Sequence, residues 1–348
     1  MKSMTRLTYI TAALVLTTLT GCRKDLCYNH YREVTVTTDY EQEWERNNGF
    51  DVRSAWDDDV LGHAYEDFTP APGQLVACLI YNKDTGTSTI TYLTEQTEHI
   101  TMPAGNNSLM FFNNENDVME FYNLDDRTTA MCVTVQRSRA TYSPESDEEV
   151  TVAEPEMMYG CYLSDVDTVG IHEKRDLQAH MTPLVYTYVI NVRFDHGLEY
   201  VSLARGAVSG MARGVFLRDG GTTAETATIL FDECIITNRG LVTKLYAYGP
   251  PNYLDSDFNG PAPSRSLYNS STGTQRLNIE VMLSNGTIKE FYFDISDQIA
   301  LQPIGGLITV SGARVEDDEA VAGDGSGWDP TLDNWTTVDE TLNPTEEK

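Results

Sequence analysis

Residues 276–294 read Arg-Leu-Asn-Ile-Glu-Val-Met-Leu-Ser-Asn-Gly-Thr-Ile-Lys-Glu-Phe-Tyr-Phe-Asp, two alternating apolar and polar runs around a short polar turn. Alternation with a period of two is typical of a strand that buries one face, so the stretch predicts a β-hairpin. A two-residue turn at Asn285-Gly286 would mix apolar and charged side chains on one face. A three-residue loop with Gly286 left-handed instead gives a uniform apolar face, which pairs Leu277 with Phe293 and Ile279 with Phe291. We therefore predict the bulged loop.

Similar short runs recur along the rest of the chain, separated by Gly, Asn, Asp and Pro, and no long apolar stripe of period 3.6 occurs. This pattern is typical of an all-β protein built from sandwiches. The earliest strand carries Val34, Val36 and Tyr40. The further strands that we expect cover 75–81, 88–93, 108–113, 118–122, 131–136, 157–162, 184–194, 200–207, 227–231, 241–247 and 306–315.

The length of 348 residues exceeds one ordinary domain and favours two. Residues 164–178 are polar and carry many charges, so we place the domain boundary between 178 and 179. The predicted organisation is a signal peptide over 1–21, an N-terminal β-sandwich over 22–178, a C-terminal β-sandwich over 179–316 and a tail over 317–348.

The N-terminus has the features of a bacterial secretion signal. A basic start precedes an apolar run over 7–19, which is shorter than the roughly 20 residues that cross a bilayer. Leu19-Thr20-Gly21-Cys22 then resembles the lipobox, whose cysteine receives diacylglycerol and thereby anchors the protein. Lys24 and Asp25 are similar to the short signals that send such lipoproteins to the cell exterior. We expect a lipoprotein that Cys22 holds on the outer membrane, at the cell surface.

The tail differs in kind from the rest of the chain. Residues 316–329 are acidic and rich in glycine, a composition that buries too little apolar surface to order itself. Apolar content returns further on, at Trp335, Val338 and Leu342. A tether that leads to an apolar extended segment suggests that this segment docks, either on its own domain or on another molecule.

Composition excludes one class of partner. The chain has 53 Asp and Glu residues against 24 Lys and Arg residues, and binding to nucleic acid requires clustered basic residues. Beyond Cys22 the cysteines are odd in number, and their disulfide pairing stays open: Cys27, Cys78, Cys132, Cys161 and Cys234. No C-x-x-C pair occurs, and we expect no metal and no cofactor.

The sequence contains no H-E-x-x-H, G-x-S-x-G or Walker A pattern, and its six histidines form no i, i+4 pair. We therefore expect a protein without catalytic residues that is not an enzyme. Its many carboxylates leave a hydrolase with an unrecognised acid pair as a third, weaker hypothesis. Asp167-Thr168-Val169 fits a short bacterial O-glycosylation pattern, which makes Thr168 a candidate for modification.

Five stretches carry a resemblance to a known family. They are CRKDLCYNH over 22–30, PEMMYG over 155–160, SGMARGVFL over 209–217, the stretch 293–312 with its Asp-Gln pair and double glycine, and NWTTVDETL over 334–342. On these residues the chain resembles the fimbrillin superfamily of Bacteroidales, in particular fimbrillin-like lipoproteins grouped as a domain of unknown function. The resemblance covers essentially the whole mature chain.

The resemblance implies two transthyretin-like Greek-key β-sandwiches and assembly into pili by strand exchange. A protease would cut after an arginine, for which Arg32 and Arg46 are candidates, and the first strand would take Val34, Val36 and Tyr40 out of a groove. Trp335, Val338 and Leu342 of a neighbouring subunit would refill the groove. A sandwich that lacks one strand exposes unpaired backbone groups and apolar core, so the mechanism is physically sound.

Two alternatives stay open beside it. The first strand would otherwise be an ordinary edge strand and the tail an ordinary docked terminus. The protein would then be a monomeric surface lipoprotein that binds glycan or a host ligand through the loop 249–273, with Tyr253, Phe258 and Tyr268 as contacts.

Overall fold

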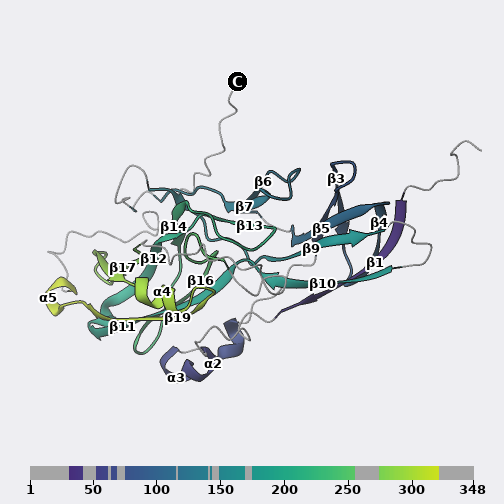
Figure 1. Cartoon of the computed structure of the whole chain (residues 1–348). Helices are drawn as coiled ribbons and strands as arrows, with labels where there is room; N and C mark the ends of the chain where they lie inside the picture. Colours follow the sequence, from purple (N-terminus) through teal and green to yellow (C-terminus); the bar gives the residue numbers. More distant parts are fainter. Residues whose placement is uncertain are drawn as a thin grey trace, which may run out of the picture.

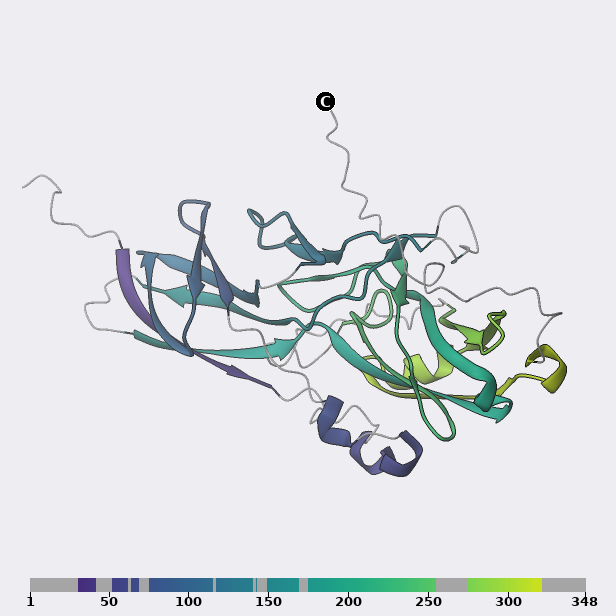
Figure 2. The ribbon, with the colours of Figure 1, turned by 180° about the vertical axis from the view of Figure 1, so that it is seen from behind.

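The computed structural model describes residues 31–41, 52–61, 64–68, 75–114, 117–139, 142, 149–168, 175–254 and 274–320. Over these residues the protein is all-β with several sheets, as the sequence predicts. The molecule is elongated, with one layered β unit at each end (Figure 1, and from behind in Figure 2). None of the described helices is both long and apolar enough to cross a membrane.

The first sandwich has seven strands in the order β3-β2-β5-β9-β10-β1-β4. Their bounds are β1 Tyr31–Tyr40, β2 Val76–Asn82, β3 Thr87–Leu93, β4 Thr97–Pro103, β5 Asn106–Asn113, β9 Tyr159–Asp167 and β10 Arg175–Pro183. β9 and β10 pair at only two positions, so the strands form two layers, β4-β1-β10 and β9-β5-β2-β3. Apolar side chains from both layers make one buried core between them.

The second sandwich pairs a sheet of order β15-β16-β11-β19 with a sheet of order β18-β17-β12-β14-β8. The first of these contains β11 Tyr186–His196, β15 Ile235–Ile236, β16 Gly240–Ala247 and β19 Gly306–Arg314. The second contains β8 Thr151–Val152, β12 Val201–Ala212, β14 Thr226–Phe231, β17 Arg276–Leu283 and β18 Ile288–Asp294. The 3-10 helix η3 Leu198–Tyr200 links β11 to β12, and α4 Ser296–Leu301 contributes Ile299 to the core.

The predicted hairpin is confirmed in its register. Leu277 lies opposite Phe293 and Ile279 opposite Phe291, and Gly286 has a φ of 82°. The amide of Gly286 donates to the carbonyl of Leu283 at 2.9 Å, which closes the short loop. A slip of the register by one residue would move the apolar side chains of the hairpin to the solvent face. The need to keep them on the core side therefore determines the loop length.

A third, small sheet and a pair of helices lie on opposite long sides of the molecule (Figure 1). The sheet has the order β13-β7-β6, from β6 Met119–Tyr122, β7 Met131–Thr134 and β13 Gly214–Phe216. The short helices are α2 Val52–Ala55, α3 Asp58–Leu61, η2 Tyr65–Phe68 and, near the C-terminal end, α5 Asp317–Ala320. Leu61 of α3 packs on Val189 and Val242, which lie on the outer face of the second sandwich.

The two halves of the chain are interleaved. β8 and β7 come from the first half and pair with β14 and β13 from the second half. The predicted boundary between 178 and 179 falls inside β10, which belongs to the first sandwich up to Pro183. The boundary was placed at the end of the polar stretch 164–178. Its last residues begin β10, where Asp176 and Gln178 are exposed while Ala179 and Met181, further along the strand, are buried.

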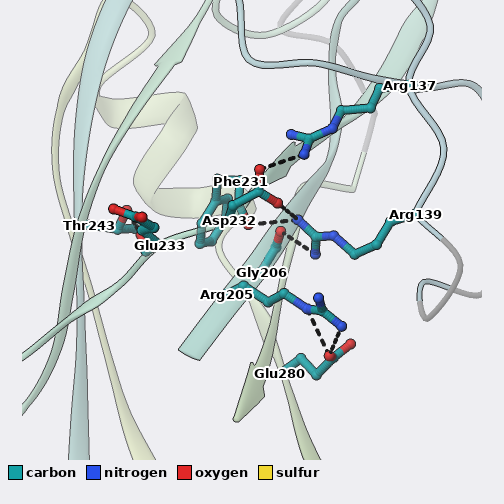
Figure 3. A network of polar contacts seen from close by, with 9 residues as sticks. All are labelled: Arg137, Arg139, Arg205, Gly206, Phe231, Asp232, Glu233, Thr243 and Glu280. Atoms are coloured by element: carbon teal, nitrogen blue, oxygen red, sulfur yellow. Dashed lines mark hydrogen bonds and ion pairs between the residues drawn. The ribbon is translucent and has the colours of Figure 1, made fainter. Parts of the chain in front are cut away.

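Buried ionic contacts fix the first-half segment that crosses to the second sandwich (Figure 3). Arg139 is buried and donates to the carbonyls of Phe231 at 2.7 Å and Gly206 at 3.2 Å, and to Asp232 at 3.0 Å. Nearby, the Nε of Arg205 donates to Glu280 Oε1 at 2.8 Å, and both side chains are buried. A buried charge is tolerated only with its partner in place, so these contacts specify one arrangement of the strands.

Replacing Glu280 by Ala should lower the free energy of unfolding by about 3–5 kcal/mol, because the buried guanidinium of Arg205 loses its carboxylate. The double variant Arg205→Met, Glu280→Leu should recover most of that loss, since it removes both charges. Glu316→Ala is the matched control, because it breaks an exposed pair with Arg314 and should change stability little. Denaturant titration measures all three, and an equal loss in the first and third variants would contradict the argument.

Candidate functional site

The strand singled out by the sequence, β1, is paired along both of its edges. It runs parallel to β10 from Val34 opposite Arg175 to Tyr40 opposite Met181, which is seven residue pairs. It runs antiparallel to β4 over seven further pairs, from Tyr31 opposite Pro103 to Thr37 opposite Thr97. The alternative of an ordinary edge strand is therefore wrong, because β4 lies outside β1 and is itself the edge.

The inward face of β1 fills a slot between its neighbours. Val34 and Val36 are 1% and 0% exposed, and Thr38 is also buried. Tyr40, at the end of the strand, packs edge-on against Tyr159 with 5.2 Å between ring centroids. Removing β1 would therefore expose core side chains together with the backbone groups of β4 and β10.

The outward face of β1 makes polar contacts with both neighbouring strands. Thr35 Oγ1 lies 3.3 Å from His99 Nδ1, and the hydroxyls of Thr37 and Thr97 are 3.1 Å apart, both toward β4. Toward β10, Asp39 accepts a hydrogen bond from Gln178 at 2.9 Å and lies 2.8 Å from His180 Nδ1. These contacts hold the strand in one register.

The carboxyl group of Asp39 titrates below its ordinary range. Partial burial alone would raise its pKa, but hydrogen bonds from Gln178 and His180 and the positive charge of His180 more than offset that effect. The net pKa of Asp39 is lowered, so its ionised form favours the folded state.

The two candidate cleavage arginines differ in what a cut would release. Arg32 is the second residue of β1 and lies opposite Met102, so a cut after it leaves Val34, Val36 and Tyr40 attached to the rest of the chain. Arg46 lies outside the described residues, but in the sequence it follows the whole strand. The geometry of β1 therefore favours Arg46, which the sequence alone did not distinguish from Arg32.

Several other site residues from the sequence lie outside the described residues, namely Cys22, Lys24, Asp25, Phe258, Tyr268, Trp335, Val338 and Leu342. Tyr253, the one described contact of the predicted ligand-binding loop, is half-buried and packs against the core of the second sandwich. Its amide donates to Thr222 Oγ1 at 2.7 Å, and its carbonyl accepts from the amide of Thr222 at 2.7 Å. The backbone of Tyr253 is thus held by the fold, and its contact with a ligand stays a prediction.

The prediction of O-glycosylation at Thr168 is wrong for the folded chain. Thr168 is 0% exposed. Its hydroxyl donates to the carbonyl of Pro103 at 3.0 Å and accepts from the amide of Gly105 at 3.1 Å. The residue fastens the start of β5 to the end of β9, and a glycan on Oγ1 would break both contacts.

The described cysteines are held mainly in the protonated thiol form. Cys78, Cys132, Cys161 and Cys234 are free thiols, and burial raises the pKa of Cys132, Cys161 and Cys234 to about 12. Cys78 and Cys161 both lie opposite Phe111, one on each side of β5. Two strand spacings separate them by about 10 Å, beyond the reach of a disulfide. In the described part of the chain no three His, Cys, Asp or Glu side chains gather to hold a metal ion.

Two elements of this site were missed from the sequence. β4 alternates polar Thr97, His99 and Thr101 with buried Ile100 and Met102, so a period-two signal was present but short. In β10 the buried Ala179 and Met181 alternate with polar Gln178 and His180, and the charges just before them, on Arg175 and Asp176, suggested a linker. Gln178 and His180, the partners of Asp39, were therefore not predicted.

Val36→Asp should lower the free energy of unfolding by about 3 kcal/mol or more, because it places a carboxylate in a fully buried position. Thr35→Asp adds the same charge on the outward face of β1, beside His99, and should change stability by less than about 1 kcal/mol. Denaturant titration of the two variants measures the difference. Equal effects would show that the two faces of β1 are not inside and outside as described.

Asp39→Asn should destabilise the protein at neutral pH but not in acid. The folded-state pKa of Asp39 lies below its ordinary value of 3.8, so its contribution is present above that pH and is lost as the pH falls through the folded pKa. The denaturant midpoints of wild type and variant should differ at pH 7 and converge as the pH falls through the lowered folded-state pKa of Asp39. Asp176→Asn, on the exposed face of β10, is the control for loss of one charge, and a pH-independent difference at Asp39 would contradict the link.

Comparison with known proteins agrees with this fold. A family described as a domain of unknown function, DUF5119, matches residues 66–232, a stretch that crosses both sandwiches. No curated protein matches the chain. A candidate adhesin from Bacteroides ovatus ATCC 8483 aligns with a TM-score of 0.56 at 16% identity, over 85% of this chain and 94% of its own.

Two further solved structures align less closely. A second candidate adhesin from Bacteroides ovatus gives a TM-score of 0.46 at 8% identity, over 81% of this chain and 89% of its own. The fimbrial anchor protein Mfa2 from Porphyromonas gingivalis gives a TM-score of 0.43 at 11% identity, over 81% of this chain and 90% of its own. The match to the first Bacteroides ovatus protein shows that the two chains share a fold.

Proposed function

We propose that this chain is a fimbrillin-like lipoprotein of the bacterial surface, a structural or adhesive component of a pilus that assembles by strand exchange at β1. Its role in this proposal is binding, without catalysis. The observation that carries the proposal is the position of β1. The strand is buried on its inward face and paired on both edges, yet it precedes every other described element of the chain.

A single cut after Arg46 would turn β1 from part of the chain into a bound peptide. Its backbone pairs with seven residues on each neighbour, and Val34 and Val36 fill the core. Each hydrogen bond contributes about 0.5–1.5 kcal/mol net, and each buried aliphatic side chain about 1.5–3 kcal/mol. The peptide would therefore leave only slowly, and an incoming strand that restores the same contacts would bind stably.

The ends of the chain complete the proposed assembly. Acylation of Cys22 would anchor the precursor on the outer membrane, and Lys24 with Asp25 would direct it to the cell exterior. Trp335, Val338 and Leu342 would form the segment that this chain donates to another pilus subunit. Support comes from the shared fold with a protein described as a candidate adhesin. A monomeric ligand-binding lipoprotein remains the competing function, and the next experiment separates the two.

Strand exchange is tested with the full chain carrying a site for a sequence-specific protease inserted after Arg46. After cleavage and removal of the freed N-terminal peptide, a fluorescent peptide with the sequence of Tyr31–Tyr40 should enter the slot and form a complex that survives size-exclusion chromatography. The matched control carries the same site after His30, where cleavage leaves β1 attached, and it should take up no peptide.

Equal uptake by both proteins would mean adventitious binding elsewhere. No uptake by the first protein, with cleavage verified by intact mass, would refute strand exchange and favour the monomeric ligand-binding function. The natural cleavage site is checked separately, because Arg46→Ala should block processing of the cell-derived protein while Arg32→Ala should not.

A further inference from the structure

The slot that β1 occupies has four inward-facing positions with defined sizes. Three are held by small side chains, Val34, Val36 and Thr38, and the fourth by the aromatic Tyr40. Val34 lies opposite Ile100 of β4, and Thr38 lies opposite Ala179 of β10. The first three positions are buried, so each must receive an apolar group or a hydroxyl that finds a partner.

Thr38 shows what the third position offers. Its hydroxyl donates to the carbonyl of Gln96 at 3.3 Å, and its amide donates to the same carbonyl at 2.8 Å. Between the third and fourth positions the outward residue Asp39 meets Gln178 and His180. The slot therefore matches a strand with β-branched, β-branched, Thr or Ser, and aromatic residues at alternate positions, and with a carboxylate just before the aromatic residue.

The C-terminal segment of this chain does not match that pattern. Successive strand residues point to opposite faces, so Trp335 and Val338, three apart, cannot both point into one slot. Val338 and Leu342 share a face, but Glu340 lies between them on that face. In fact every set of four alternate residues from Trp328 to Pro344 includes Asp, Glu, Asn or Pro. This holds for either direction of the strand.

Such residues are costly in the slot. A carboxylate at a buried position without a cation costs several kcal/mol, and an amide without a partner costs about 1–3 kcal/mol. In the direction of β1, the least unfavourable register places Leu332, Asn334, Thr336 and Val338 inward, which puts an amide where Val36 is 0% exposed. In the reverse direction the same residues put that amide at the buried position of Thr38. A second copy of this chain is therefore a poor donor for its own slot.

We propose that the slot vacated by β1 receives a strand from a different protein, with the pattern described above, and that copies of this chain do not extend one another. The inference rests on the strand-exchange function proposed above and adds that the partner is a different protein rather than a second copy of this chain. This chain would then occupy a junction between unlike subunits, with its own C-terminal segment directed to a different groove.

The test uses the full chain cleaved after Arg46 with the labelled Tyr31–Tyr40 peptide in the slot, and unlabelled peptides compete for it. A peptide of Trp328–Pro344 should compete at least about tenfold less well than unlabelled Tyr31–Tyr40, since each 1.4 kcal/mol is a factor of about ten. The same peptide with Asn334→Val should regain about tenfold, because the substitution removes the amide from the most buried position.

Thr337→Val in that peptide is the matched control. Thr337 lies on the opposite face of the strand from Asn334. Every register that points residue 337 into the slot also points Asp333 or Asp339 into it, so the added apolar side chain should not improve competition. Two differently tagged copies of the cleaved protein should likewise form no SDS-resistant pair.

Competition by the native C-terminal peptide within about threefold of Tyr31–Tyr40 would overturn the inference and leave strand exchange intact. Equal improvement by Asn334→Val and Thr337→Val would also overturn it. Failure of the labelled Tyr31–Tyr40 peptide itself to enter would instead refute the proposed function, so the two failures are distinguishable.

Discussion

Pairing of β1 on both edges is the constraint on which the first sandwich depends. Among the described strands, β4 has β1 as its only neighbour in the sheet, so without β1 the layer β4-β1-β10 breaks into two unconnected strands. Val34 and Val36 also belong to the core that joins this layer to β9-β5-β2-β3. One N-terminal strand of ten residues thus closes a layer and fills a core. An equivalent strand supplied by another molecule would do the same.

The slot is held open by the rest of the fold. β10, one wall of the slot, continues through Leu184 and Val185 into β11, a central strand of the second sandwich. Segments from the first half, fixed by Arg139 and by β8, lie on that sandwich as well. The wall is therefore tied to a framework that does not include β1. This division between a removable strand and a fixed framework is what an exchange mechanism requires.

The sequence predicted what short-range pattern encodes and missed what depends on distant partners. The Arg276–Asp294 hairpin was correct to the residue pair, because one polar turn and one apolar face leave a single consistent register. β10 was not found, because its charged face resembles a linker until β1 is seen beside it. Thr168 matched a surface motif, but the chain folds its hydroxyl onto Pro103 and Gly105, which lie 65 and 63 residues away in the sequence. β1 itself was predicted, but its interior position follows only from the sheet order.

Hydrogen–deuterium exchange tests the central claim most directly. In the uncut protein the amides of β4 and β10 that face β1 should be protected, as in any paired strand interior. After cleavage at the peptide bond that follows Arg46 and removal of the freed peptide, protection of the amides from exchange should fall in β4 and at residues 175–181 of β10. The amides of β11, β16 and β17 should keep their protection. Unchanged protection in β4 and β10 after β1 has been removed, or loss of protection throughout both sandwiches, would contradict the account.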